Sequence, residues 1–190
     1  MMFSDLDKIM VVCQWGVVIG ASLVAAIWDV RTRRIPNLLT LPVLAAGLVW
    51  AGFTGGLSGL AEAVVACLLL ALPFVLLFLF AGGGAGDAKL MGAIGIWLGL
   101  SQGVTVLFCV AAAGIILAVS KAIMTKRFKA VITNVFISVY IFISSVVYSN
   151  AKLVMQRQVK DIAGRTNVVT VPYGTAIFAG VCMAGSIILL

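Results

Sequence analysis

Long apolar runs, separated by short polar segments, constrain this chain more than any other feature of its sequence. Several runs approach the roughly 20 residues that a helix needs to cross a bilayer. Of the 190 residues, 63% are hydrophobic and 10% are charged, whereas a soluble domain is about half apolar and a quarter charged. The runs therefore predict an all-α fold, a polytopic membrane helix bundle formed as a single domain over residues 1–190.

The polar segments divide the apolar runs into six predicted transmembrane helices. The first run follows the acidic residues Asp5 and Asp7 and has no small-residue cleavage site, so we interpret it as a retained span rather than a signal peptide. The predicted spans are Ile9–Trp28, Leu38–Phe53 with Asn37 as its N-cap, a third run that ends near Ala81, Leu90–Leu100, Val104–Lys121 after a turn at Ser101-Gln102-Gly103, and Gly174–Leu190.

The segment Val131–Tyr148 is apolar enough for a further span, but polar side chains recur on one face of the helix that it would form. A helix with a polar stripe can lie in the membrane interface instead. Basic residues both precede and follow this segment, and an interfacial position keeps all of them inside, as the positive-inside rule prefers. We therefore favour a cytoplasmic interfacial helix, and the transmembrane alternative stays open.

Arginines after the first span set the expected orientation. The loop with Arg31, Arg33 and Arg34 is expected to be cytoplasmic, which places the N-terminus outside. Two crossings later, the segment Gly82–Lys89 is cytoplasmic as well. The net charge of +7 is explained by this orientation and by anionic lipid. We therefore expect the lipid bilayer as a partner, and no nucleic acid.

Two aspartates stand out in this topology. Asp87 follows the glycines of Gly82–Lys89 between two apolar segments, where an ionisable side chain is costly and indicates function. Asp29 ends the first span, where the dipole of the helix disfavours negative charge. Span counting alone puts both on the same side of the membrane. Simpler roles stay open: Asp87 as an N-cap, and Asp29 in an ion pair with Arg31 or Arg33.

Paired carboxylates suggest acid–base chemistry. Two that share a water in a low-dielectric cleft hold one proton between them, which provides an acid and a base. The base would activate water against a peptide carbonyl, and the acid would protonate the leaving nitrogen. Lys89 could tune the pair or bind an acidic substrate group, or simply snorkel. The chain has no histidine and its four cysteines are isolated, so we expect no metal and no cofactor.

Three short patterns, in this order, resemble the type IV prepilin peptidases, a family of GxGD intramembrane aspartyl proteases. Asp29-Val-Arg31 with Ile35-Pro36-Asn37 resembles their first block, and Gly84-Ala85-Gly86-Asp87-Ala88-Lys89 resembles their second. Pro172-Tyr173-Gly174 resembles their C-terminal proline–glycine element. The resemblance implies catalysis by Asp29 and Asp87, and substrate-binding or structural roles for Gly84, Gly86, Lys89, Pro36, Asn37, Pro172 and Gly174.

The resemblance also implies a substrate and a location. Prepilin or pseudopilin leaders would be cleaved after a glycine, at the cytoplasmic face of the bacterial inner membrane. Larger members carry a cysteine-rich domain and methylate the new N-terminus, but only Asp29–Asn37 separates the first two predicted spans here. We therefore expect the compact form of tight-adherence (Flp) pilus systems, without N-methyltransferase activity. A small proton-coupled transporter or a pilus-assembly scaffold is the alternative.

The glycines before Asp87 suggest how such a substrate is held. A scissile peptide bond must be extended to reach a pair of carboxylates. We hypothesise that backbone groups at Gly84 and Gly86 pair with the extended leader, as an added strand pairs with a sheet edge. A side chain at Gly86 would obstruct that approach, whereas Gly82 is expected to tolerate alanine.

Overall fold

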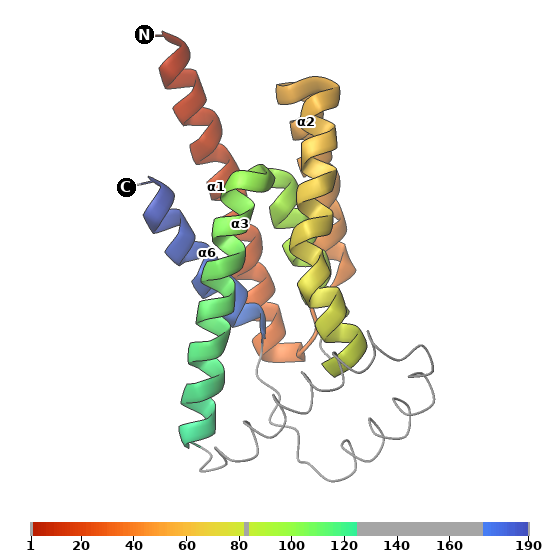
Figure 1. The fold of residues 1–190 in the computed structure, drawn as a ribbon, viewed down its shortest axis with the longest axis vertical. Helices are drawn as coiled ribbons and strands as arrows, with labels where there is room; N and C mark the ends of the chain where they lie inside the picture. The colour runs from red at the N-terminus through yellow and green to blue at the C-terminus, as the bar shows by residue number, and fades with distance from the viewer. Residues whose placement is uncertain (1, 82–83, 125–172, 190) are drawn as a thin grey trace, which may run out of the picture. The chain divides into compact units, whose positions relative to one another are not determined.

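The described part of the chain is helical. The computed structural model describes residues 2–81, 84–124 and 173–189, which contain helices and no strand. Three helices are long and apolar enough to cross a membrane, judged by length and composition, and a shorter apolar helix follows. The prediction of an all-α membrane protein is confirmed for these residues. The helices are α1 (Met2–Thr32), α2 (Asn37–Ala81), α3 (Ala85–Met124) and α6 (Tyr173–Leu189) (Figure 1).

The chain divides into two compact units. The first comprises Met1–Ile116 and Pro172–Leu190, and the second comprises Leu117–Val171. Most of the second unit, together with Pro172, lies outside the described residues. The interfacial helix at Val131–Tyr148 and the single domain over 1–190 therefore stay predictions. The fold and the site below belong to the first unit.

Helix α1 is longer than the apolar pattern predicts. It ends at Thr32 instead of Trp28, because a helix can continue into polar residues as long as its backbone N–H and C=O groups stay hydrogen-bonded. Arg33 then takes a left-handed conformation with φ of 53°. Its N–H donates to the carbonyl of Asp29 at 2.8 Å, as in a common helix C-cap. Asp29 lies in the last turn of α1, at the helix C-terminus where the sequence places it, and only the end of the helix comes later than predicted.

Helix α2 reverses direction at Gly56. The backbone there has φ of 60° and ψ of −144°, a region that is almost restricted to glycine. The two halves then pack closely, because a Cβ built on Gly59 would lie 2.7 Å from the carbonyl oxygen of Ala51. An unbroken 45-residue helix would extend about 68 Å, more than twice the thickness of a bilayer core. The reversal thus falls between the predicted span that ends at Phe53 and the predicted third run.

Helix α3 reverses at Gly99, earlier than predicted. Gly99 has φ of 68° and ψ of −170°, and the chain is helical again from Leu100, so the predicted turn at 101–103 is wrong. The Glu62 carboxylate explains the position, because its Oε1 accepts a hydrogen bond from the Leu100 N–H at 3.2 Å. It thereby satisfies one donor at the start of the second half of α3. The first half begins at Ala85 rather than Leu90.

Helix α6 packs against α1 and α3 with small residues at the contacts. Trp15 of α1 is 1% exposed, and a Cβ on Gly185 would lie 3.3 Å from its ring. Gly180 approaches the backbone of Val110 so closely that any side chain there would collide. The indole N–H of Trp15 donates to Gln102 at 2.9 Å. This packing fixes the first turn of α6 near the end of α1, where the candidate site lies.

Candidate active site

Asp29 is held by the first turn of α6. Its side chain is buried, with 6% exposed, and its Oδ2 accepts a hydrogen bond from the backbone N–H of Gly174 at 2.8 Å. The N-terminus of a helix presents unpaired N–H groups and the positive end of the dipole. Helix α6 therefore offsets the unfavourable position of this carboxylate at the C-terminal end of α1.

Gly174 is required to be small by this contact. A Cβ at this position would lie 2.9 Å from the Asp29 Cβ and 3.1 Å from its Oδ2. The first of these distances is shorter than real Cβ contacts, so one of the two groups would have to move. Glycine lets the backbone of α6 reach the carboxylate directly. The structure thus places Gly174, a predicted site residue, against one of the two aspartates.

Asp87 occupies the first turn of α3, near its start at Ala85. Its N–H donates to the carbonyl of Gly84 at 3.2 Å, and its carboxylate is hydrogen-bonded to the backbone of Gly84. This reciprocal arrangement resembles a capping box, in which an acid in the first turn reaches back to the cap residue. Gly84 is the cap, so the simple reading of Asp87 as the N-cap residue is wrong.

The two aspartates lie close enough to interact electrostatically. Asp29 is buried, whereas Asp87 is partly exposed, so one carboxylate is enclosed and the other borders the surface. Both lie at the end of the bundle where α1 finishes and α3 begins (Figure 1). The structure therefore brings together the two acids that span counting placed on one side. Such a pair can hold one proton and exchange it with a bound water.

Residues 35–37 contact the start of α3. The carbonyl of Pro36 accepts bonds from the N–H groups of Leu39 and Thr40 at 3.1 and 3.4 Å, so Pro36 holds the cap position of α2. The prediction that Asn37 is the N-cap is wrong, because Asn37 is the first helical residue. Its Oδ1 instead accepts a hydrogen bond from Lys89 Nζ at 2.8 Å. Lys89 therefore links the start of α3 to the start of α2.

Gly86 allows the start of α3 to touch the segment between α1 and α2. A Cβ on Gly86 would lie 2.8 Å from the Cβ of Ile35 and 3.2 Å from its carbonyl oxygen. Ile35 is itself buried, with 9% exposed. The close neighbour of Gly86 is therefore a residue of the same chain. Gly84, in contrast, is exposed and borders the Asp87 carboxylate, since its Cβ would lie 2.8 Å from Oδ2.

Tyr173 is a neighbour of the site that the sequence reasoning did not single out. It packs edge-on against Phe74, with ring centroids 5.9 Å apart and planes at 76°. Its hydroxyl lies 2.6 Å from where a Cβ on Gly114 would stand, and it interacts electrostatically with Asp87. Its position next to Gly174, in the Pro172-Tyr173-Gly174 element, is the sequence feature that could have indicated it. Tyr173 anchors the turn of α6 that binds Asp29.

The described residues provide no alternative centre for metal chemistry. Among residues 2–81, 84–124 and 173–189, no group of three or more histidine, cysteine, aspartate or glutamate side chains could hold a metal ion. The four cysteines are free thiols on separate helices or helix segments. The site is therefore built from two carboxylates, backbone donors and one lysine–asparagine contact.

A sequence model of the type IV leader peptidase family matches residues 16–119. The chain belongs to the type IV leader peptidase family. The matched segment contains both aspartates, the residues Pro36 and Asn37, and the glycines and lysine around Asp87. The family resemblance inferred from the motifs is thus confirmed, and the apolar helices make this family member a multi-pass membrane protein.

Individual relatives agree with the family assignment. The chain is 30% identical over 120 residues to a prepilin leader peptidase/N-methyltransferase of Neisseria gonorrhoeae, covering 59% of this chain and 42% of the relative. It is 38% identical over 94 residues to one of Pectobacterium carotovorum subsp. carotovorum, covering 45% of this chain and 33% of the relative. The match thus spans a third to about two fifths of these curated relatives. No solved structure matches.

Proposed function

We propose that this family member is a prepilin leader peptidase that cleaves the leaders of type IV or Flp prepilins after a glycine. The observation that carries the proposal is the pairing of Asp29 with Asp87. They come from separate motifs, on α1 and α3, and they interact electrostatically at one end of the bundle. The family match over residues 16–119 supports the same chemistry, as do the names of the relatives.

The proposed reaction is direct hydrolysis by water. One carboxylate takes a proton from the water as the water oxygen bonds to the carbonyl carbon of the glycine at the scissile bond. The other, protonated, carboxyl polarises the carbonyl oxygen and then gives a proton to the leaving nitrogen as the C–N bond breaks. The leader leaves with a new carboxylate and the pilin with a new amine. The Gly174 N–H keeps the Asp29 carboxylate oriented throughout.

The positions of the reversals support a six-span arrangement in the inner membrane. The reversals at Gly56 and Gly99 divide α2 and α3 into two segments each, as the prediction of separate spans requires. We propose that the loop with Arg33 and Arg34 is cytoplasmic, so the aspartates face the cytoplasm. A cysteine placed at Arg34 should react from the cytoplasmic side, and one at Gly55 from outside. The opposite pattern would invert the proposed topology.

The loops beside the aspartates suggest how the substrate is accommodated. Because Lys89 Nζ is hydrogen-bonded to Asn37, we assign Lys89 to holding the starts of α2 and α3 together rather than to binding an acidic group of the leader. Because Ile35 adjoins Gly86, the extended leader is better placed along the exposed Gly84. We also propose the compact form without N-methyltransferase activity, since only residues 33–36 separate α1 from α2.

Reconstitution of the purified protein in liposomes tests the function. A model prepilin should be shortened at the bond after its leader glycine, as mapped by mass spectrometry. A proton or solute flux without cleavage would favour the alternative, a small transporter, and neither activity would favour a scaffold. Addition of a chelator should leave cleavage unchanged, because the proposed hydrolysis uses carboxylates alone. Loss of cleavage that zinc restores would overturn the aspartyl mechanism.

A further inference from the structure

The first turn of α6 reaches both carboxylates of the candidate site. The backbone N–H of Gly174 donates to Asp29 Oδ2 at 2.8 Å, and the side chain of the preceding residue, Tyr173, interacts electrostatically with Asp87. Residues that are adjacent in a helix point about 100° apart, so one turn can serve two groups that lie on different helices. The hydrogen bond accounts for Gly174, but packing does not account for the Tyr173 hydroxyl.

Two other helices fix the position of Tyr173. Its ring packs edge-on against the buried Phe74 of α2, with centroids 5.9 Å apart. A Cβ on Gly114 of α3 would lie 2.6 Å from the Tyr173 hydroxyl oxygen, so the glycine leaves the room that the hydroxyl occupies. A phenylalanine at position 173 would keep the ring contact and need less of that room. The hydroxyl therefore has a defined position that filling space does not require.

The Tyr173 hydroxyl lies near Asp87 without a direct bond to it. Among the described residues, the hydroxyl has no hydrogen-bond partner, although it interacts electrostatically with Asp87. Both side chains are only partly buried, so water can reach the space between them. Polar groups that interact across such a gap are commonly bridged by a water. The Asp87 carboxylate, which bonds the backbone of Gly84, has further acceptor positions for one.

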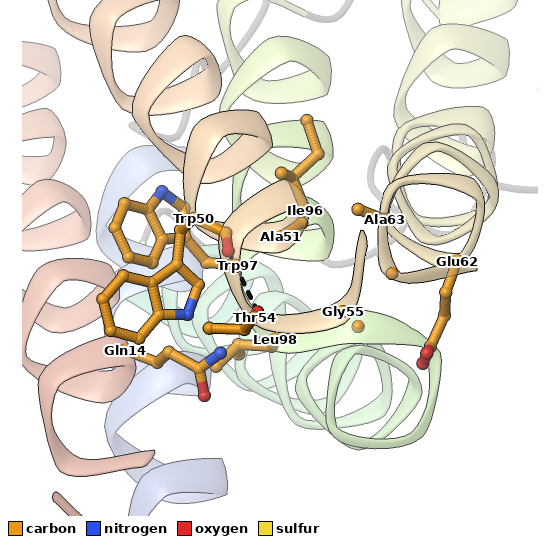
Figure 2. A pocket seen from close by; sticks show the side chains of 12 residues that line it. Gln14, Trp50, Ala51, Thr54, Gly55, Glu62, Ala63, Ile96, Trp97 and Leu98 are labelled. Atoms are coloured by element: carbon orange, nitrogen blue, oxygen red, sulfur yellow. Dashed lines mark hydrogen bonds between the residues drawn. The ribbon is translucent and has the colours of Figure 1, made fainter. Parts of the chain in front are cut away.

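Accessible polar groups do not converge in this way at the other end of the bundle. A pocket of about 230 Å³ lies there, beside the reversals of α2 and α3. Figure 2 shows that the Glu62 carboxylate points away from Trp50 and Trp97, and the Trp50 indole nitrogen is buried. A molecule in the pocket would therefore not contact both polar groups. At the aspartates, in contrast, Tyr173 and Asp87 can both be reached by one water.

We propose that Tyr173 is a positioning residue of the active site, whose hydroxyl donates a hydrogen bond to a water that in turn donates to the Asp87 carboxylate. This bridge fixes the orientation of Asp87, as the Gly174 N–H fixes that of Asp29. The first turn of α6 thus orients both members of the pair, one through its backbone and the other through a side chain.

A titration of the purified protein tests the bridge without substrate. The titratable groups that interact with Asp87 are Asp29 of α1 and Tyr173 of α6, whereas Lys89 of α3 donates to Asn37. Infrared spectra across a pH series follow the carboxyl band that Asp87→Asn abolishes. A hydrogen bond to a carboxylate favours its ionised form, so Tyr173→Phe should move the midpoint of this band about one pH unit upward.

Cleavage of a model prepilin tests the effect on the reaction, and this part rests on the proposed function. Tyr173→Phe should lower kcat about tenfold with KM and the unfolding temperature unchanged, since the ring contact with Phe74 is kept. Gly114→Ala, whose Cβ would collide with the hydroxyl, should lower kcat as well. It should cost less than about threefold more in the Tyr173→Phe background, where the hydroxyl is absent. Gly16→Ala is the control, because a Cβ there has nothing within 4 Å.

The outcomes separate this role from simple packing and from the proposed function. An unchanged titration midpoint in Tyr173→Phe would overturn the proposal, and so would a loss of kcat that only follows a lower unfolding temperature. If Gly114→Ala does not fold, Tyr173→Phe decides alone. A shifted midpoint in a protein that cleaves no prepilin would support the bridge to Asp87 and contradict the peptidase function.

Discussion

The two ends of this helical bundle use their acidic residues in different ways. At one end, Asp29 is buried and receives an N–H from α6, and a second carboxylate, Asp87, lies within electrostatic reach. At the other end, Glu62 is exposed and binds the N–H of Leu100 at the reversal of α3. Both acids satisfy helix N-termini, so that contact alone does not mark function. The second carboxylate is what makes the first end suited to acid–base chemistry.

Loss of either aspartate should have the largest effect on the cleavage rate, and it tests the difference between the two ends of the bundle. Asp29→Asn and Asp87→Asn should each lower the cleavage rate about 10²- to 10⁴-fold, because the pair needs both carboxyl groups. Glu62→Gln removes the negative charge but keeps an oxygen that can accept the Leu100 N–H, so it should retain cleavage within about tenfold. Asp7→Asn controls for the change in charge. The cleavage rates are measured with purified proteins in liposomes. Full cleavage by either asparagine variant would contradict the proposal that the reaction needs both carboxyl groups.

A methyl group on Gly174 should have the next largest effect. Gly174→Ala puts a Cβ within 2.9 Å of the Asp29 Cβ, and a displacement of about 1 Å in a reacting group can cost about 10²-fold. Gly20→Ala is the matched control, because a Cβ there has nothing within 4 Å. Cleavage rates and unfolding temperatures should be measured for both. Equal rates would show that the contact of α6 with Asp29 does not matter for the reaction.

A side chain at Gly86 should lower cleavage by forcing the start of α3 away from Ile35. The contact with Ile35 leaves no room for a Cβ, so Gly86→Val should reduce the rate about 10-fold or more. Gly82→Ala, farther from Asp87 in sequence, should cleave one prepilin at a near-normal rate. Near-native cleavage rates for both variants would show that Gly86 is not part of the active site and only helps the chain to turn.

The contact of Lys89 with Asn37 should have the smallest effect. Both side chains are exposed, so Lys89→Met and Asn37→Leu should each reduce cleavage only about threefold, with a coupling of about 0.6 kcal/mol in a double-mutant cycle. Coupling shows that the two residues act as one contact between the starts of α2 and α3. Additive losses of cleavage rate, with a raised KM in Lys89→Met alone, would instead indicate that Lys89 binds the leader.

Much of the acidic end can be predicted from sequence, because span counting and the arginines after Asp29 need only local information. The contact of Asp29 with Gly174 joins residues 145 positions apart, so no local pattern indicates it. The same limit explains the reversal of α3. Ser101-Gln102-Gly103 has turn chemistry, but Glu62, 38 positions away from Leu100, determines that the reversal occurs at Gly99.

A single-turnover cleavage in water labelled with ¹⁸O tests the central claim most directly. Purified protein in excess over a model prepilin is allowed to react, and the leader and the protein are examined by mass spectrometry. If Asp29 and Asp87 activate water together, one labelled oxygen should appear in the new carboxylate at the leader's terminal glycine, and none in either aspartate. Label in Asp29 or Asp87, or cleavage at a different bond, would contradict direct attack by water at the paired carboxylates.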